Sequence, residues 1–200
     1  MLRRLALPVL VVLAAVLGGL LPRLAGPAES STEVRFVREM IQHHAQAVDM
    51  ATRVREASSD PQVRVLALDI MLSQQEQIGQ MRGWLTLWKR PWAGAGMDAG
   101  HAHAMGMATQ AQVENLSALR GRAADVNFLQ LMIRHHQGAL GMVGPALNPG
   151  VRPEVQALAR QIQATQSAEV ALMTRLLRER GAQPLPTPAS SPADMDGMQH

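Results

Sequence analysis

The chain has 200 residues, a formal net charge of +3 at neutral pH and no cysteine. Without cysteine there can be no disulfide, no thiolate ligand and no CxxCH haem attachment, so any metal must be held by histidine, methionine or carboxylate. The 19 basic residues are scattered, and the aromatic residues are only two Phe and three Trp. This composition lacks the basic, aromatic-bearing patch of nucleic-acid-binding proteins, so we expect no nucleic-acid partner.

The first 28 residues have the pattern of a secretory signal. Arg3 and Arg4 precede an apolar run over residues 5–21, and Gly26-Pro27-Ala28 then leads into polar sequence. We expect either a signal peptide cleaved after Ala28 or an uncleaved membrane anchor over residues 5–21, because the run is close to the length of a spanning helix. Both alternatives predict a periplasmic, secreted or cell-envelope protein.

A first helical hairpin is predicted over residues 33–89. Ser30-Ser31-Thr32-Glu33 offers a capping box, and apolar residues then recur with the spacing of a bundle helix as far as Val54. The sequence Ser58-Ser59-Asp60-Pro61 predicts the end of this helix and the start of the next, with Asp60 as N-cap. The second helix is expected to reach about Trp88.

Residues 90–124 are interpreted as a linker. Its segment PWAGAGMDAGHAHAMGM is too rich in glycine and alanine to predict a regular packed element. A capping box at Thr109 and Gln112 predicts a short helix that ends at about Arg120. The linker also carries soft-metal donors that could capture an ion from solution, namely His101, His103, Met105 and Met107.

A second hairpin is predicted over residues 125–180. Asp125 is the expected N-cap of its first helix, and Gly144-Pro145 is the expected end. Pro153 then opens a last helix that reaches about Arg180. The remaining residues 182–200 form a Pro/Ser-rich tail, predicted to be disordered, which carries the further soft donors Met195, Met198 and His200.

The two hairpins are near copies at an offset of 92 residues. The segment FVREMIQHHAQAVDM at 36–50 recurs as FLQLMIRHHQGALGM at 128–142, and the second helices of the two hairpins match at the same offset without a gap. A lone hairpin cannot bury its apolar face. We therefore predict an all-α fold, a ferritin-like antiparallel four-helix bundle made of two duplicated hairpins over residues 30–181.

Both copies retain histidine and methionine on one helical face. Residues three, four and seven apart share a face, which places both histidine doublets on or beside the buried stripe. Imidazole and thioether together suit Cu(I) or Ag(I). The candidate metal ligands are Met40, His43, His44, Met50, Met132, His135, His136 and Met142. Met81, Met173 and the four linker donors are candidate additional ligands, and Gln74 and Gln166 are candidate hydrogen-bond partners of the imidazoles.

Several alternatives stay open at this point. Buried histidines are often hydrogen-bonded core residues, and a methionine stripe is usually only packing. A four-helix bundle can also hold a b-type haem between Met and His, or serve as a structural cell-envelope module without metal. A carboxylate-bridged di-iron site is disfavoured because the sequence has no Glu-x-x-His motif. We expect no enzyme, since no nucleophile or orienting carboxylate recurs beside the doublets.

The pattern F-x-x-x-M-I-x-H-H-x-x-A-x-x-M occurs twice, followed each time by Gln-x-x-x-[Ile/Val]-x-x-Met. It resembles the family catalogued as domain of unknown function 305, over about residues 33–180. The resemblance implies a ferritin-like bundle, a secreted or periplasmic location, and copper or silver handling by the doublets and their methionines. The family usually has Glu just before the Ile or Val, which Glu169 matches and Gln77 does not.

Our leading hypothesis from the sequence is therefore a non-catalytic, extracytoplasmic protein that buffers or delivers Cu(I). Its discriminating feature is a ligand set of methionine and histidine without cysteine. Delivery would require a partner protein that receives the ion. The linker and tail donors are expected to capture metal rather than to store it. Flexible ligands must lose conformational entropy on chelation, whereas the ligands on the bundle helices are already ordered.

Overall fold

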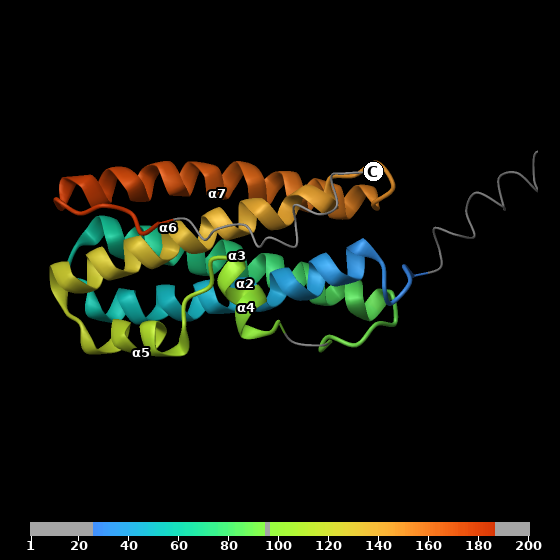
Figure 1. Ribbon diagram of the computed structural model, residues 1–200, viewed down its shortest axis with the longest axis horizontal. Coiled ribbons are helices and arrows are strands. Elements are labelled where there is room, and N and C mark those ends of the chain that lie inside the picture. Colours follow the sequence, from blue (N-terminus) through green and yellow to red (C-terminus); the bar gives the residue numbers. More distant parts are fainter. Residues whose placement is uncertain (1–25, 95–96, 187–200) are drawn as a thin grey trace, which may run out of the picture.

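The computed structural model describes residues 26–94 and 97–186, and every regular element in that part of the chain is a helix (Figure 1). The helices are α2 (Thr32–Ala57), α3 (Pro61–Leu87), α4 (Ala99–Ala104), α5 (Gln110–Ala118), α6 (Gly121–Ala146) and α7 (Pro153–Glu179). None of these helices is both long enough and apolar enough to span a membrane. Most of the predicted signal or anchor, residues 1–25, lies outside the described residues.

The four long helices form an antiparallel bundle, as predicted. Helices α2 and α3 form one hairpin, α6 and α7 form another, and α2 lies against α6. Successive long helices run in opposite directions, and α6 runs opposite to α2 (Figure 1). The histidine-bearing helices of the two hairpins therefore meet inside the molecule.

Local capping explains where several helices begin. The Ser31 hydroxyl accepts a hydrogen bond from the Val34 N–H at 3.3 Å. Asp60 caps α3 as predicted, with its Oδ1 accepting from the N–H groups of Gln62 at 2.8 Å and Val63 at 3.3 Å. The predicted capping box at Thr109 is also present at the start of α5. These side chains satisfy backbone donors that have no partner within the helix.

The prediction of an irregular linker is wrong for its middle part. Residues 99–104 form α4, which Asp98 caps by accepting from the His101 N–H at 2.9 Å. The segment is docked on the bundle, because the Gln46 amide exchanges two hydrogen bonds with the backbone of Ala108, at 2.9 and 2.7 Å. These tertiary contacts offset the weak helix preference of the glycine-rich sequence, which periodicity alone cannot reveal.

Helix α6 also differs from its prediction at both ends. It begins at Gly121 and continues through Gly144 and Pro145 to Ala146. Pro145 is the second-last residue of the helix, so its missing N–H removes only one bond of the final turn. Asp125 is therefore not an N-cap; it lies within α6 and is 3% exposed.

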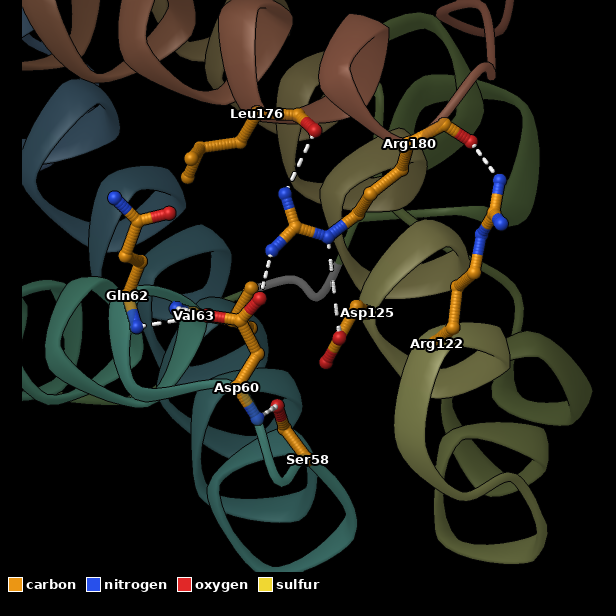
Figure 2. A network of polar contacts seen from close by, with 8 residues as sticks. All are labelled: Ser58, Asp60, Gln62, Val63, Arg122, Asp125, Leu176 and Arg180. Atoms are coloured by element: carbon orange, nitrogen blue, oxygen red, sulfur yellow. Dashed lines mark hydrogen bonds and ion pairs between the residues drawn. The ribbon is translucent and has the colours of Figure 1, made fainter.

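Asp125 belongs instead to a polar cluster that joins the two hairpins at one end of the bundle (Figure 2). Arg180, just after α7, pairs with the Asp60 carboxylate at the start of α3, and its Nε lies 3.9 Å from Asp125 Oδ2 on α6. Burial alone would raise the pKa of Asp60, but the capped N–H groups and the Arg180 guanidinium lower it below its usual value.

The chain after α7 turns back onto the bundle. Gln130 donates from Nε2 to the Gln183 carbonyl at 2.7 Å, and Leu185 packs against the core. The prediction of a disordered tail is thus wrong for residues 182–186. The remaining tail donors, Met195, Met198 and His200, lie outside the described residues.

The bundle has two apolar cores separated by a polar layer. One core uses α2 from Ala47 onward together with the first half of α6, and the other uses α2 up to Ile41 together with the second half of α6. The buried side chains between them are polar on all four long helices. This layer consists of His43, His44, Gln74, Gln77, His135, His136 and Gln166, together with the partly buried Glu169.

Candidate metal site

All four doublet histidines lie in the polar layer, at the middle of α2 and α6. Their exposed fraction is zero for His43, His44, His135 and His136 alike, so the predicted burial of both doublets is confirmed. Helical periodicity places each doublet on the inner face because the preceding and following apolar residues must face the core.

Each of the four imidazoles uses Nε2 to contact an oxygen atom. His44 Nε2 lies 2.7 Å from Gln77 Oε1, and His136 Nε2 lies 2.7 Å from Glu169 Oε2. His43 Nε2 lies 3.0 Å from the Met105 carbonyl oxygen, and His135 Nε2 lies 3.1 Å from the His43 carbonyl oxygen. Since all four partners are acceptors, the hydrogen-bond network places a proton on Nε2 of each ring.

In a neutral ring with this tautomer, the other nitrogen, Nδ1, carries a lone pair. None of the four Nδ1 atoms has a hydrogen-bond partner among residues 26–94 and 97–186. Buried polar atoms are normally paired, so four unpaired nitrogens in one layer are unusual for a core that serves only packing. A metal-binding histidine usually donates its other N–H to a carboxylate or a backbone carbonyl, and the same pattern is present here.

Burial keeps three of these rings neutral. It lowers the pKa of His43 to about 3 and that of His44 to about 4, and the neighbouring rings lower the pKa of His43 further. Burial also holds the pKa of His135 well below its ordinary value. At neutral pH the Nδ1 lone pairs of these three rings are therefore free of protons and available to a metal ion.

The two doublets meet at one point of the bundle. The rings of His43 and His135 stack with centroids 3.6 Å apart and planes inclined by 31°. The outer rings are further away: the ring centroid of His44 lies 6.4 Å from that of His43, and the ring centroid of His136 lies 6.1 Å from that of His135. The four imidazoles thus form one continuous row rather than two isolated pairs.

The hydrogen-bond partners of the outer rings differ from the prediction. Gln74 and Gln166 are buried at 2% exposure, yet neither amide has a hydrogen-bond partner in the described parts of the chain. Gln77 and Glu169, one turn further along α3 and α7, contact the outer rings instead. The sequence signal for this role is the 33-residue separation, which is the same for His44 and Gln77 as for His136 and Glu169.

The predicted methionines divide between the two sides of the histidine layer. Met40, Met81 and Met142 lie in one apolar core, and Met50, Met132 and Met173 lie in the other. Met40 and Met50 are ten residues apart on one helix, or about 15 Å, so they cannot serve the same ion. Each core contains methionines from both hairpins.

The linker donors occupy different environments. Met105 is partly buried against the core, and its carbonyl contacts His43. The Nε2 of His101 lies 3.6 Å from Glu39 Oε1 on α2, whereas His103 is exposed. Met107 is partly buried beside Ala108, which Gln46 holds. The docked linker therefore covers the His43 ring of the first doublet.

Carboxylates contribute little to this layer. Across the described residues, no group of three or more His, Cys, Asp or Glu side chains is arranged to hold a metal ion. A site that combines imidazole with thioether is outside that class, and it is the donor set that Cu(I) and Ag(I) prefer.

The sequence matches the family model "Domain of unknown function (DUF305)" over residues 33–177. The chain belongs to the DUF305 family. A curated relative, the uncharacterized protein L153 of Acanthamoeba polyphaga mimivirus, is 35% identical over 51 residues, which is 26% of this chain and 34% of that protein. The chain thus spans about a third of the length of that relative.

Solved structures of DUF305 proteins have the same fold. One from Streptomyces coelicolor, inferred to be secreted, is 38% identical with a TM-score of 0.73, covering 80% of this chain and 99% of its own. A fragment from Deinococcus radiodurans is 48% identical with a TM-score of 0.71, covering 76% and 99%. CopM in its Cu(I)-bound form is 28% identical with a TM-score of 0.61, covering 74% and 96%, and CopM also has Cu(II)-bound and Ag-bound structures.

Proposed function

We propose that this protein is a non-catalytic, extracytoplasmic binding protein whose cargo is Cu(I), with Ag(I) as an alternative ion. The ion is held in the histidine layer by Nδ1 atoms of the doublets, with thioethers completing the coordination from the adjacent cores. Buffering, delivery and metal tolerance are all served by such a site. Delivery would involve a partner protein that accepts the ion.

The observation that carries this proposal is the state of the four buried imidazoles. Their Nε2 atoms all contact oxygens, and their Nδ1 atoms have no partner within the described chain. Ring orientation and tautomer are therefore set before any ion arrives, which reduces the entropy lost on binding.

Two comparisons support the proposal. CopM, which has a similar fold, has Cu(I)-, Cu(II)- and Ag-bound structures. The Streptomyces coelicolor relative is inferred to be secreted, which agrees with the signal-like sequence of residues 1–28. A site without cysteine also suits an oxidising compartment, because thioether and imidazole do not form disulfides.

The rings of His43 and His135 are in contact at a centroid separation of 3.6 Å, which leaves no space for a porphyrin between these two histidines. A haem held by one Met and one His is the alternative to be tested by absorption. A Soret band in the purified protein would identify haem immediately. A purely structural module predicts that no metal is bound after exposure to copper.

The proposal is tested by anaerobic competition of the protein with a chromogenic Cu(I) chelator. The first variant replaces all four doublet histidines by leucine, which has a similar volume and no lone pair. We expect its affinity for Cu(I) to fall by at least about a hundredfold, or 2.7 kcal/mol. The matched control is His101→Ala/His103→Ala, which should remain within about threefold of the parent.

Variants of the two side chains that contact the outer rings test whether these side chains position the imidazoles or only pack against them. Glu169→Ala and Gln77→Ala each remove the oxygen that orients an outer ring, and each should weaken Cu(I) binding by about ten- to a hundredfold. Circular dichroism checks that helicity is retained. Unchanged stoichiometry and affinity in the four-leucine variant would overturn the proposal, and loss of binding in the His101/His103 control would move the site to α4.

A further inference from the structure

One end of the bundle carries all three tryptophans of the protein. Trp84 and Trp88 stack with ring centroids 6.0 Å apart and planes inclined by 20°, and Trp92 follows just after α3. Trp88 is buried at 5% exposure, whereas Trp92 is 58% exposed. The cluster is separate from the histidine layer, because Trp84, its first member, lies seven residues, or about 10 Å, beyond Gln77 along α3.

Large apolar side chains are held in the solvent at this end. Leu87 is 77% exposed, the highest value of any large apolar side chain in the described residues. The exposed Trp92 is fixed in place, because its Nε1–H donates to the Thr86 hydroxyl at 2.9 Å. Leu87 and Trp92 are therefore two exposed apolar side chains at the same end of the bundle, and they stay in water unless a partner covers them.

Basic groups surround this surface. The Arg82 guanidinium lies 5.4 Å from the Trp92 ring centroid, and Lys89, the only lysine in the chain, is exposed. The acidic side chain of Glu29 at this end pairs with Arg38 and lies 4.0 Å from Arg90. We call the group Arg82, Trp84, Leu87, Lys89 and Trp92 the aromatic end.

The first described residues of the chain lie against the bundle at the same place. Gly26 packs so closely on Trp88 that a Cβ there would lie 2.6 Å from the Trp88 carbonyl oxygen. The Pro27 carbonyl accepts a hydrogen bond from Arg90 Nε at 2.8 Å. The start of the described chain and the end of α3 lie at one end of the bundle (Figure 1). Gly26 and Pro27, the first described residues of the chain, therefore lie beside the aromatic end.

We propose that the aromatic end is a membrane-contact face that rests on the surface of an anionic phospholipid bilayer. Tryptophan is favoured at the level of the headgroups, where its ring is apolar and its N–H is polar. A leucine beside it adds apolar area that enters the interface, and arginine and lysine attract anionic headgroups. The contact requires no spanning helix among the described residues and is independent of the metal proposal.

The face has an intrinsic reporter, because every tryptophan of the chain lies in it or stacks against it. The protein is purified in the form that the cell produces after any processing of the N-terminal segment. It is then mixed with phosphatidylcholine/phosphatidylglycerol vesicles. We expect a blue shift of the tryptophan emission. Replacing the phosphatidylcholine by its brominated form should reduce the emission by about twofold or more, since bromine quenches only on contact with the interface.

The test variant is Leu87→Gln/Trp92→Gln, and the matched control is Val65→Gln/Leu72→Gln, which changes two side chains of 59% and 55% exposure elsewhere on α3. The test variant should lose most of the bromine quenching of Trp84 and Trp88, whereas the control should retain it. Quenching should also weaken at least about threefold in high salt, because the lipid charge is screened.

Several results would overturn the proposal. Emission that is insensitive to brominated lipid would show that the aromatic end does not touch the bilayer. Quenching that is lost equally in both double variants would show that membrane contact is not specific to the aromatic end. Concentration-dependent dimerisation in sedimentation velocity, abolished by Leu87→Gln/Trp92→Gln, together with absence of quenching would assign the face to a second copy of the chain.

Discussion

The ring of His43 stacks on the ring of His135 with centroids 3.6 Å apart, and the Nε2–H of His135 donates to the backbone carbonyl of His43 at 3.1 Å. The contact joins α2 to α6 at the centre of the bundle, far from solvent. A proton on either Nδ1 would place a cation against a second imidazole in a region of low polarity. The folded protein therefore strongly favours the neutral form of both rings.

This relationship predicts that the metal-free protein loses stability in mild acid. The pKa values of His43 and His44 are lowered to about 3 and about 4 in the folded state, so the unfolded chain takes up protons first as the pH falls below about 6.5. Stability should be fully present above that pH and should decrease by up to about 1.4 kcal/mol per pH unit for each buried neutral histidine towards pH 4.

Urea unfolding of the metal-free protein at several pH values between about 7.5 and 4.5 measures this slope. Replacing His44 by leucine should reduce the slope by about one proton, whereas His103→Ala should leave it unchanged because that side chain is exposed. A free energy of unfolding that does not change over this range would contradict the assignment of neutral, buried rings.

The polar layer also predicts opposite effects for two glutamines one turn apart on α3. Gln74 is buried and its amide has no hydrogen-bond partner in the described chain, whereas Gln77 accepts from His44. Gln74→Leu should raise the free energy of unfolding of the metal-free protein by about 1 kcal/mol, because an unpaired buried amide is costly. Gln77→Leu should lower it by about 1–3 kcal/mol, because it leaves the Nε2–H of His44 unpaired.

Chemical denaturation of the two variants under identical conditions checks this pair of predictions. Gln74→Met is the control for shape, since it replaces the amide by an apolar group of similar length. Equal effects of Gln74→Leu and Gln77→Leu would mean that the two amides have the same environment, contrary to the structure.

The docked linker predicts a large difference between two glycines of α6. A Cβ at Gly138 would lie 1.8 Å from the Met105 carbonyl oxygen, whereas one at Gly141 would meet nothing within 4 Å. Gly141→Ala should stabilise the protein by about 0.5–1 kcal/mol through helix propensity. Gly138→Ala should destabilise it, because the backbone of Met105 must move away from α6 and from His43.

Hydrogen exchange followed by mass spectrometry localises this effect. Protection of residues 101–108 should fall in Gly138→Ala and stay at the parental level in Gly141→Ala. Unchanged protection in Gly138→Ala would show that the linker does not rest on α6 in solution.

Much of this fold follows from periodicity and local chemistry. The spacing of apolar residues locates the four long helices, and the same spacing places His43 and His135 on inner faces. The cap at Asp60 and the capping box at Thr109 could be read from sequence because each acts within three residues.

The remaining features depend on contacts between distant segments. The segment that carries α4 is held on α2 by the two bonds between Gln46 and Ala108, and such long-range contacts leave no periodic signal in a glycine-rich segment. Asp125 could be mistaken for a cap because its partner Arg180 is 55 positions away in the chain. Gln77 rather than Gln74 contacts His44 because the two glutamines lie about one turn apart along α3, a difference that periodicity does not resolve.

The most direct test of the copper proposal is a long-range ¹H–¹⁵N spectrum of the histidine rings, recorded with and without one equivalent of Ag(I). This ion is diamagnetic and shares the ligand preference of Cu(I). We expect Nδ1 resonances of His43, His44, His135 or His136 to shift and couple to silver, while the Nε2 atoms stay protonated. Shifts confined to His101 and His103, or no shift in any ring, would contradict it.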